Sequence, residues 1–264
     1  MTDAHCHPWD LSELEDGEPE RRKHGVAAAA SAWNLEQFEY HEGLARRARE
    51  EGAPPISCTF ALHPQLSGMA DSLAMPDPAL LYDLAAQGRL GGVGETGFDL
   101  FEERYRQKEK LQEEWFRLHL ETALTFDLPL VIHQRRALHK IFPHTGDLKR
   151  LRGVIFHSWH GTLGEAEALL RRGLNAYFSL GAGICNNHKK VMAFGALGDP
   201  GRFLLESDAP FQPLRGRAHS SYGDLKVICE KLGALRKEAG SPCADPGELE
   251  ARIDENYFRI FPPP

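Results

Sequence analysis

Eight short apolar segments alternate with longer segments of helical pattern, and this alternation constrains the fold more than any other feature of the chain. The apolar segments are residues 3–7, 25–33, 55–64, 90–96, 128–134, 153–159, 175–181 and 202–210. Near-continuous apolar runs of this length are typical of strands that are buried on both faces of a sheet. Strands separated by helices predict parallel βα units.

The segments between these strands carry apolar residues at helical spacing. In residues 102–126, Leu111, Trp115 and Leu118 fall three or four positions apart, and the pattern ends before Pro129. Further helices are predicted at residues 35–50, 164–172, 186–197, 222–239 and 246–260, with a loop or short helix at 11–24.

The strand count and the length of 264 residues fit one closed (β/α)₈ barrel of the TIM type, an α/β fold. An open, doubly wound sheet is the competing architecture. No linker or repeat divides the chain, so we expect a single domain over residues 1–264.

Charge and composition exclude several classes of protein. With 31 basic and 38 acidic residues the formal net charge is −7, so no global positive field attracts nucleic acid, and any phosphate binding must use local basic groups. No apolar run approaches the roughly 20 residues needed to cross a bilayer. No signal pattern opens the chain, so we expect a cytoplasmic monomer that does not bind membranes.

The five cysteines are odd in number and scattered, which predicts reduced thiols. Cys6 alternates with His5 and His7 along a strand, so it should point away from them and pack in the core.

Metal-binding residue types end several of the predicted strands. His5 and His7 are two positions apart, so a strand directs both imidazoles to one side. The carboxyl ends of barrel strands meet at one rim, where active sites lie. The residues that would meet there are His5, His7, Glu95, His133, His157 and Asp208.

Four imidazoles and two carboxylates exceed the three protein ligands that a catalytic zinc usually has. They suit two divalent ions bridged by a carboxylate and a hydroxide, with Glu95 as the bridging carboxylate. Mixed nitrogen and oxygen ligation suits Zn, Mn, Co or Ni, and Mg alone less well.

The ordered motifs of the chain resemble those of the TatD family of metal-dependent hydrolases. They read DAHCH (3–7), ALHP (61–64), VGETGFD (93–99), LPLVIHQR (128–135), VIFHSWHG (154–161), FLLESDAPF (203–211) and ENYFRIF (255–261), and Gln112 and Phe116 match a helix motif. The segment LRGRAHSSYGDL at 214–225 departs from the family pattern. The altered loop at 212–224 therefore bears on substrate choice.

The resemblance implies a binuclear site in a TatD-type deoxyribonuclease. One ion would be held by His5, His7, Glu95 and Asp208, and the other by Glu95, His133 and His157. Asp208 and Glu95 would be the catalytic residues. Asp208 would also act as general base, the alternative being a ligand that transfers no proton.

Other residues are predicted to support this site. Glu206 lies on the same side of its strand as Asp208 and either orients a ligand or simply fills the barrel. His63 and Arg135 are predicted to bind substrate. Weaker candidates for phosphate contact are Arg136, Arg215, Arg217, His160, Lys189 and Lys190. Trp9 and Trp159 could stack on a base, but packing at the barrel mouth is the favoured interpretation.

Three functions remain open from the sequence. The first is a metal-dependent phosphodiesterase that acts on DNA ends. The second is hydrolysis, on the same site, of an ester, lactone or amide outside nucleic acids, including aminoacyl esters. The third is a metal-binding module without activity, against which the intact set of ligands argues.

Overall fold

The strands form one parallel eight-stranded sheet with the order β1 to β8. The computed structural model describes residues 1–12, 14, 17–69 and 77–262. The strands are β1 Thr2–Cys6, β2 Ala27–Ala32, β3 Ile56–Phe60, β4 Gly92–Asp99, β5 Leu130–Arg135, β6 Val154–Phe156, β7 Ala176–Leu180 and β8 Phe203–Leu205. All neighbouring pairs are parallel, which confirms the predicted βα units.

The sheet curls into a barrel because β8 returns to β1. Just beyond β8, the amide of Asp208 donates to the carbonyl of His5 (3.0 Å), and the amide of His7 donates to the carbonyl of Ala209 (2.8 Å). The closed (β/α)₈ barrel is confirmed, and the open sheet is not what forms. This closure brings the first and last of the predicted metal-ligand motifs side by side.

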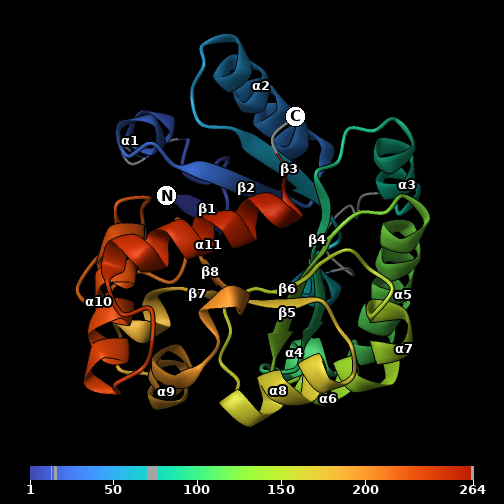
Figure 1. Cartoon of the computed structure of the whole chain (residues 1–264). Helices are drawn as coiled ribbons and strands as arrows, with labels where there is room; N and C mark the ends of the chain where they lie inside the picture. Colours follow the sequence, from blue (N-terminus) through green and yellow to red (C-terminus); the bar gives the residue numbers. More distant parts are fainter. Residues whose placement is uncertain (13, 15–16, 70–76, 263–264) are drawn as a thin grey trace.

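Helices surround the barrel (Figure 1). The longer ones are α2 Leu35–Glu50, α3 Ala79–Ala86, α5 Glu109–Thr125, α8 Leu163–Arg171, α9 Lys189–Leu197, α10 Asp224–Glu238 and α11 Pro246–Ile260. Shorter ones are α1 Glu18–Lys23, α4 Glu103–Arg106, α6 Leu138–Ile141 and α7 Thr145–Leu148. Short 3₁₀ turns occur at Pro64–Met69, Phe142–His144, Ala182–Ile184 and Pro200–Arg202.

The helix predicted at residues 102–126 is wrong in one respect, because it is interrupted between α4 and α5. The buried amide of Gln112 donates to the carbonyl of Tyr105 (2.9 Å) and also to that of Asp99 (3.2 Å). These side-chain bonds hold the turn at the end of α4. The helices α3, α6 and α7 were not predicted, whereas α1 confirms the short helix expected within residues 11–24.

The two ends of the barrel differ. Helix α11 crosses the end where the strands begin (Figure 1), where the Asp254 carboxylate accepts a bond from the Thr2 hydroxyl (2.8 Å). Tyr257 and Ile260 pack there on barrel residues such as Val131 and Leu204. The predicted site residues lie at the opposite end of the barrel, where the strands finish.

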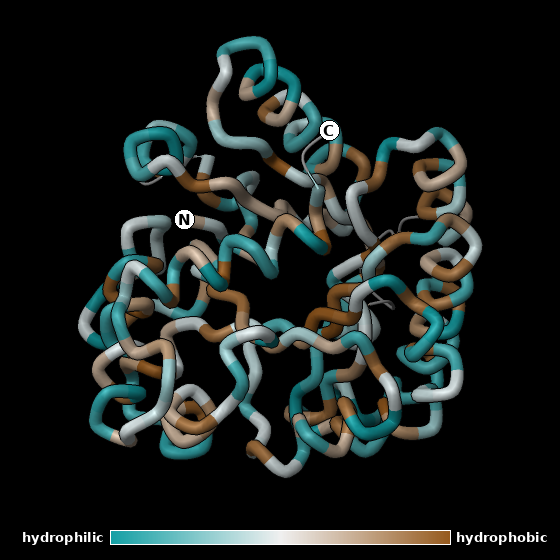
Figure 2. The backbone as a smooth tube through the Cα atoms, in the orientation of Figure 1, coloured by the Kyte–Doolittle hydropathy of each residue, from teal (hydrophilic) through white to brown (hydrophobic). Residues whose placement is uncertain are grey.

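The core follows the predicted burial of the strands. Figure 2 shows hydrophobic segments in the barrel and along the inner sides of the helices. Trp159 is only 1% exposed and packs on Phe178 and Phe194, so the packing interpretation is confirmed for it and no base can stack there. The five cysteines are free, and Cys6 is fully buried, as predicted. Among the described residues, no helix is long and apolar enough to span a bilayer.

Candidate metal centre

Six side chains predicted as ligands converge at the end of the barrel where the strands finish. His5 and His7 come from the end of β1, Glu95 from the middle of β4, and His133 from β5. His157 follows β6 directly, and Asp208 follows β8. Glu95, His5, His157 and Asp208 are buried, while His7 and His133 are slightly exposed toward the rim.

Glu95 lies at the centre of this group. Its Oε2 atom is 3.1 Å from Nε2 of His5. Its Oε1 atom faces three more imidazoles, at 2.5 Å from Nδ1 of His133, 3.1 Å from Nε2 of His157 and 3.1 Å from Nε2 of His63. One carboxylate therefore faces both halves of the site, which is the position that a bridging ligand requires.

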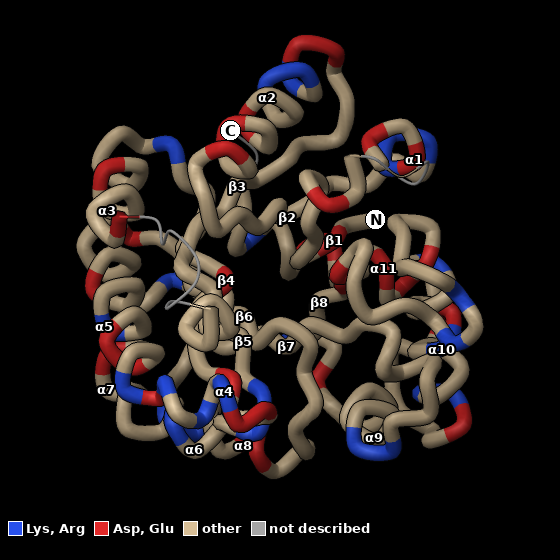
Figure 3. Tube along the Cα trace, turned by 180° about the vertical axis from the view of Figure 1, so that it is seen from behind, with Lys and Arg blue, Asp and Glu red and all other residues tan. Residues whose placement is uncertain are grey.

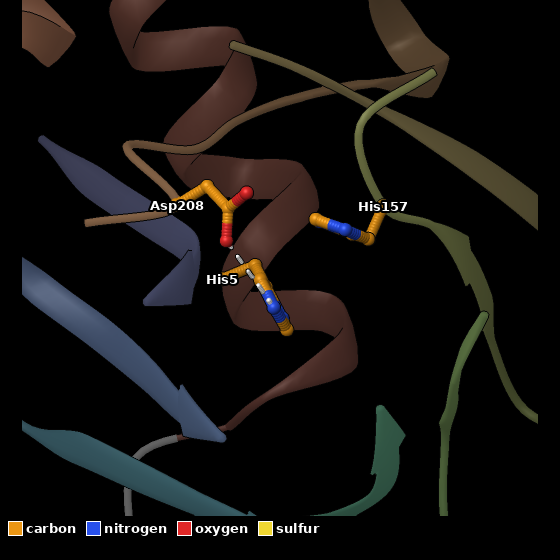
Figure 4. A group of neighbouring side chains, drawn as sticks. All are labelled: His5, His157 and Asp208. Atoms are coloured by element: carbon orange, nitrogen blue, oxygen red, sulfur yellow. Dashed lines mark ion pairs between the residues drawn. The ribbon is translucent and has the colours of Figure 1, made fainter. Parts of the chain in front are cut away.

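Asp208 closes the other side of the site. Its Oδ1 atom lies 3.4 Å from Nε2 of His7 and 3.7 Å from Nε2 of His5. Figure 4 shows its carboxylate and the imidazoles of His5 and His157 pointing toward one another from three separate elements. Its Oδ2 atom accepts a hydrogen bond from the amide of Gln212 (2.6 Å), which fixes the orientation of the carboxylate.

The donor atoms fit divalent metal ions. Three groups have ligand atoms within 4.8 Å of one another: His5, His157 and Asp208; His5, His7 and Glu95; and His63, Glu95 and His133. The Nε2 atoms of His5 and His7 lie 3.1 Å apart, so cations between these rings and the carboxylates would satisfy both. Imidazole nitrogen and carboxylate oxygen are ligands that Zn, Mn, Co and Ni accept.

The charges of the site are strongly coupled. Burial would raise the pKa of Glu95, but the imidazoles of His63, His157, His5 and His133 hold it well below its usual value. Burial alone lowers the pKa of His157, yet the carboxylates of Glu206 and Glu95 raise it well above the ordinary value. Because only neutral imidazole binds a metal, ions that enter this site displace protons.

His63 lies closer to the candidate ligands than its predicted role of substrate binding required, because its Nε2 atom is 3.1 Å from Glu95. It shares a group of potential ligands with Glu95 and His133, whereas His157 falls in a group with His5 and Asp208. The geometry thus brings the six predicted ligands together and adds a seventh candidate. How they divide between two ions stays a prediction.

Two further carboxylates contact the ring nitrogens of His157 and His133 that do not face Glu95. Glu206 is 1% exposed, and its Oε2 atom lies 3.2 Å from Nδ1 of His157, so it is placed to orient this imidazole. Asp99 was not predicted as a site residue. Its Oδ2 atom lies 3.3 Å from Nε2 of His133 and accepts a bond from Gln65 (2.8 Å).

The sequence held a signal for Asp99. It is four residues after Glu95, so on a strand both side chains point to the same side. The predicted strand ended at residue 96, whereas β4 extends to Asp99. The backbone amide of Asp99 donates to the side chain of Gln112 (2.9 Å), so α5 supports the end of this strand.

The rim cations divide into paired and unpaired groups. Arg217 forms an ion pair with Asp224, so it is less suited to bind substrate. His160 Nε2 lies 3.1 Å from Nδ1 of His188 at the rim. Arg135 and Arg136 are exposed and approach the ring of Phe101. Trp9 is half-buried and packs edge-on against Tyr40, 5.4 Å between centroids.

The family model described as TatD related DNase matches residues 2–262, nearly the whole chain. The chain belongs to the TatD family. The resemblance that its motifs carried is therefore confirmed, and so is the expectation of a metal-dependent hydrolase.

Curated TatD proteins and solved structures agree with this placement. The "3'-5' ssDNA/RNA exonuclease TatD" of Cronobacter sakazakii is 30% identical over 187 residues, which cover 69% of each chain. The "Uncharacterized metal-dependent hydrolase YjjV" of Escherichia coli is 26% identical and covers 98% of this chain and 96% of its own. The crystal structure of YjjV, with 24% identity, covers 100% of this chain and 98% of its own at a TM-score of 0.80, which supports the fold.

Proposed function

We propose that this TatD protein is a divalent-metal-dependent phosphodiesterase that shortens DNA from an end. The observation that carries the proposal is the convergence of five imidazoles on Glu95 and Asp208 at one end of the barrel. The curated relatives named as exonucleases of single-stranded DNA and RNA support a nucleic-acid substrate.

In this proposal Glu95 would help to hold two divalent ions. His5, His7 and Asp208 complete one side, and His133 and His157 the other. Such ions, when bound, supply a water activated near neutral pH and neutralise negative charge on a phosphate. Zn, Mn, Co, Ni and Mg are the candidate metals, and activity after metal replacement distinguishes among them.

Asp208 serves as general base in this reaction. Its carboxylate faces the imidazoles of His5 and His7, and the bond from Gln212 keeps it in that orientation. It takes a proton from the attacking water and returns it to the leaving oxygen of the DNA. Arg135 is exposed at the end of β5 and binds a phosphate of the substrate. His63 contacts the substrate or adds to the ligands.

The test is hydrolysis by metal-stripped protein that is re-supplied with Mn, Zn or Mg, on end-labelled single-stranded DNA. We expect a ladder of shortened products that depends on metal. Asp208→Asn should abolish it, whereas Asp83→Asn, an exposed residue of α3, should not. If Asp208→Asn loses its metal, the defect is the loss of a ligand. If it keeps the metal but not the activity, the defect is the loss of the general base.

Failure to cleave DNA, with metals bound, would contradict the proposal. The fold and the metal site would stand, and esters, lactones or amides outside nucleic acids would become the substrates to test, with the loop at 212–224 selecting among them.

A further inference from the structure

A cluster of one aromatic ring and two guanidinium groups lies beside the metal centre. Phe101 follows β4, Arg135 ends β5, and Arg136 comes next. The Cζ atom of Arg135 lies 3.8 Å from the centre of the Phe101 ring, and that of Arg136 lies 4.5 Å from it. The ring therefore holds both cations by cation–π contact.

Neither guanidinium is paired with a carboxylate among the residues that the structure describes. The neighbouring acidic residues have other partners, since Glu102 pairs with Arg104 (3.0 Å) and Glu103 pairs with Arg106 (2.5 Å). In Figure 3, Lys and Arg lie among Asp and Glu around α4 and α6, the helices that follow β4 and β5. The two exposed arginines thus keep their hydrogen-bond donors available for an anion, although the whole chain is acidic.

The cluster is tied to the metal centre by hydrogen bonds. The Oδ1 atom of Asp99 accepts a bond from the amide of Phe101 (2.8 Å), and its Oδ2 atom faces His133. The amide of Leu100 donates to the carbonyl of Arg135 (2.9 Å). Because β4 and β5 also carry Glu95 and His133, the cluster has a set position relative to the reacting phosphate.

We infer that Phe101, Arg135 and Arg136 form a phosphate-binding subsite for the part of a single-stranded DNA that lies beyond the bond being cleaved. This inference rests on the proposed function and extends it from one substrate arginine to a three-residue unit. Arginine binds phosphate with two parallel hydrogen bonds, and stacking on a ring limits the freedom that it loses on binding. The subsite recognises the backbone and carries no sequence preference.

Kinetics on substrates of two sizes test the subsite. A long single-stranded oligonucleotide reaches the cluster, whereas bis(p-nitrophenyl) phosphate occupies the metal centre alone. We expect Arg136→Gln to raise the KM for the oligonucleotide by about five- to tenfold, as loss of a phosphate contact does. Its loss of kcat/KM on the oligonucleotide should exceed its loss on the small diester. Phe101→Leu should weaken oligonucleotide binding in the same direction.

Arg46→Gln is the matched control, because Arg46 is an exposed arginine on the outer helix α2. It should behave as the unaltered protein does on both substrates. Equal losses on both substrates for Arg136→Gln, or no loss on either, would overturn the subsite.

A binding measurement separates failure of the subsite from failure of the proposed function. The metal-loaded protein is titrated with a fluorescent oligonucleotide that phosphorothioate linkages protect from hydrolysis. Arg136→Gln should reduce the salt dependence of binding by about 0.7 in log–log slope, the value for one phosphate contact on a single strand. Binding that depends on Arg136 without cleavage of normal DNA would support the subsite and contradict the nuclease. Cleavage of normal DNA, together with a salt slope that Arg136→Gln leaves unchanged, would support the nuclease and contradict the subsite.

Discussion

The carboxylate of Asp99 lies beside Nε2 of His133, the ring nitrogen that does not face Glu95. The Oδ2 atom of Asp99 lies 3.3 Å from Nε2 of His133, while Nδ1 of the same ring lies 2.5 Å from Glu95. His157 has the reverse arrangement, with Nε2 toward Glu95 and Nδ1 toward Glu206. A carboxylate therefore lies beside the second ring nitrogen of each imidazole, an arrangement that orients histidines that bind metal ions.

Replacement of Asp99 by Asn should weaken metal binding. The side chain is fully buried, and Asn keeps its size and its bond to the amide of Phe101. Loss of the carboxylate behind a ligating histidine costs about 10- to 100-fold in metal affinity. Competition with a chelator measures this affinity. The exposed variant Asp83→Asn is the control, and an affinity equal to that of the unaltered protein would contradict the role of Asp99.

Replacement of Glu206 by Gln should change how metal binding depends on pH. The pKa of His157 is raised, despite its burial, by Glu206 and Glu95, so a proton competes with the metal there up to a higher pH. Without the charge of Glu206 that pKa falls, so metal binding should extend to more acidic solution although it is weaker at high pH. Metal titrations across a pH series show this. If metal binding were lost at the same acidic pH in the variant and the unaltered protein, Glu206 would only fill space.

Replacement of Gly97 by Ala should disrupt the site from within β4. Gly97 has φ of +130°, and a Cβ atom would lie 2.1 Å from the carbonyl oxygen of His133. We expect a loss of about 2–4 kcal/mol in the free energy of unfolding, together with weaker metal binding, because the strands that carry Glu95 and His133 must separate. Urea denaturation measures the first effect.

Gly164→Ala is the matched control for this glycine. Gly164 lies in α8, and a Cβ atom there meets nothing within 4 Å. Ala should leave stability unchanged or raise it by up to about 1 kcal/mol. If both variants had the same stability, the close approach at Gly97 would not matter.

The buried His119 should make the protein less stable in acid. Its Nε2 atom accepts a bond from the amide of Leu62 (3.2 Å), and burial lowers its pKa from 6.5 to about 3. The unfolded chain therefore takes up a proton below pH 6.5 that the folded protein does not bind. Stability falls as the pH drops from 6.5 toward 3, by about 1.4 kcal/mol per pH unit for this group.

His119→Gln tests this dependence, because Gln does not titrate and can still accept a bond from Leu62. Urea denaturation at a series of pH values should give a slope for the variant that is shallower by about one proton. The comparison of slopes remains valid even if the substitution lowers stability at every pH. Parallel slopes would show that His119 is protonated in the folded protein.

The positions of the strands could be predicted because each apolar run is buried on both faces of the sheet. Helix boundaries were less predictable, since the interruption before Glu109 depends on the side chain of Gln112 reaching the carbonyl of Tyr105. The six candidate ligands could be selected because histidines and carboxylates ended several predicted strands. Asp99 was missed because the predicted strand ended at residue 96, before the position at which pairing with β5 stops.

The sequence by itself determined the alternation of strands and helices, the family and the six candidate ligands. These depend on residue types and spacings that are local in the chain. Only the tertiary structure decided that His63 lies beside the candidate ligands, that Asp99 contacts His133, and that Phe101 contacts Arg135 and Arg136. Such contacts form between separate strand ends, and closure of the barrel between β8 and β1 sets the distances across the site.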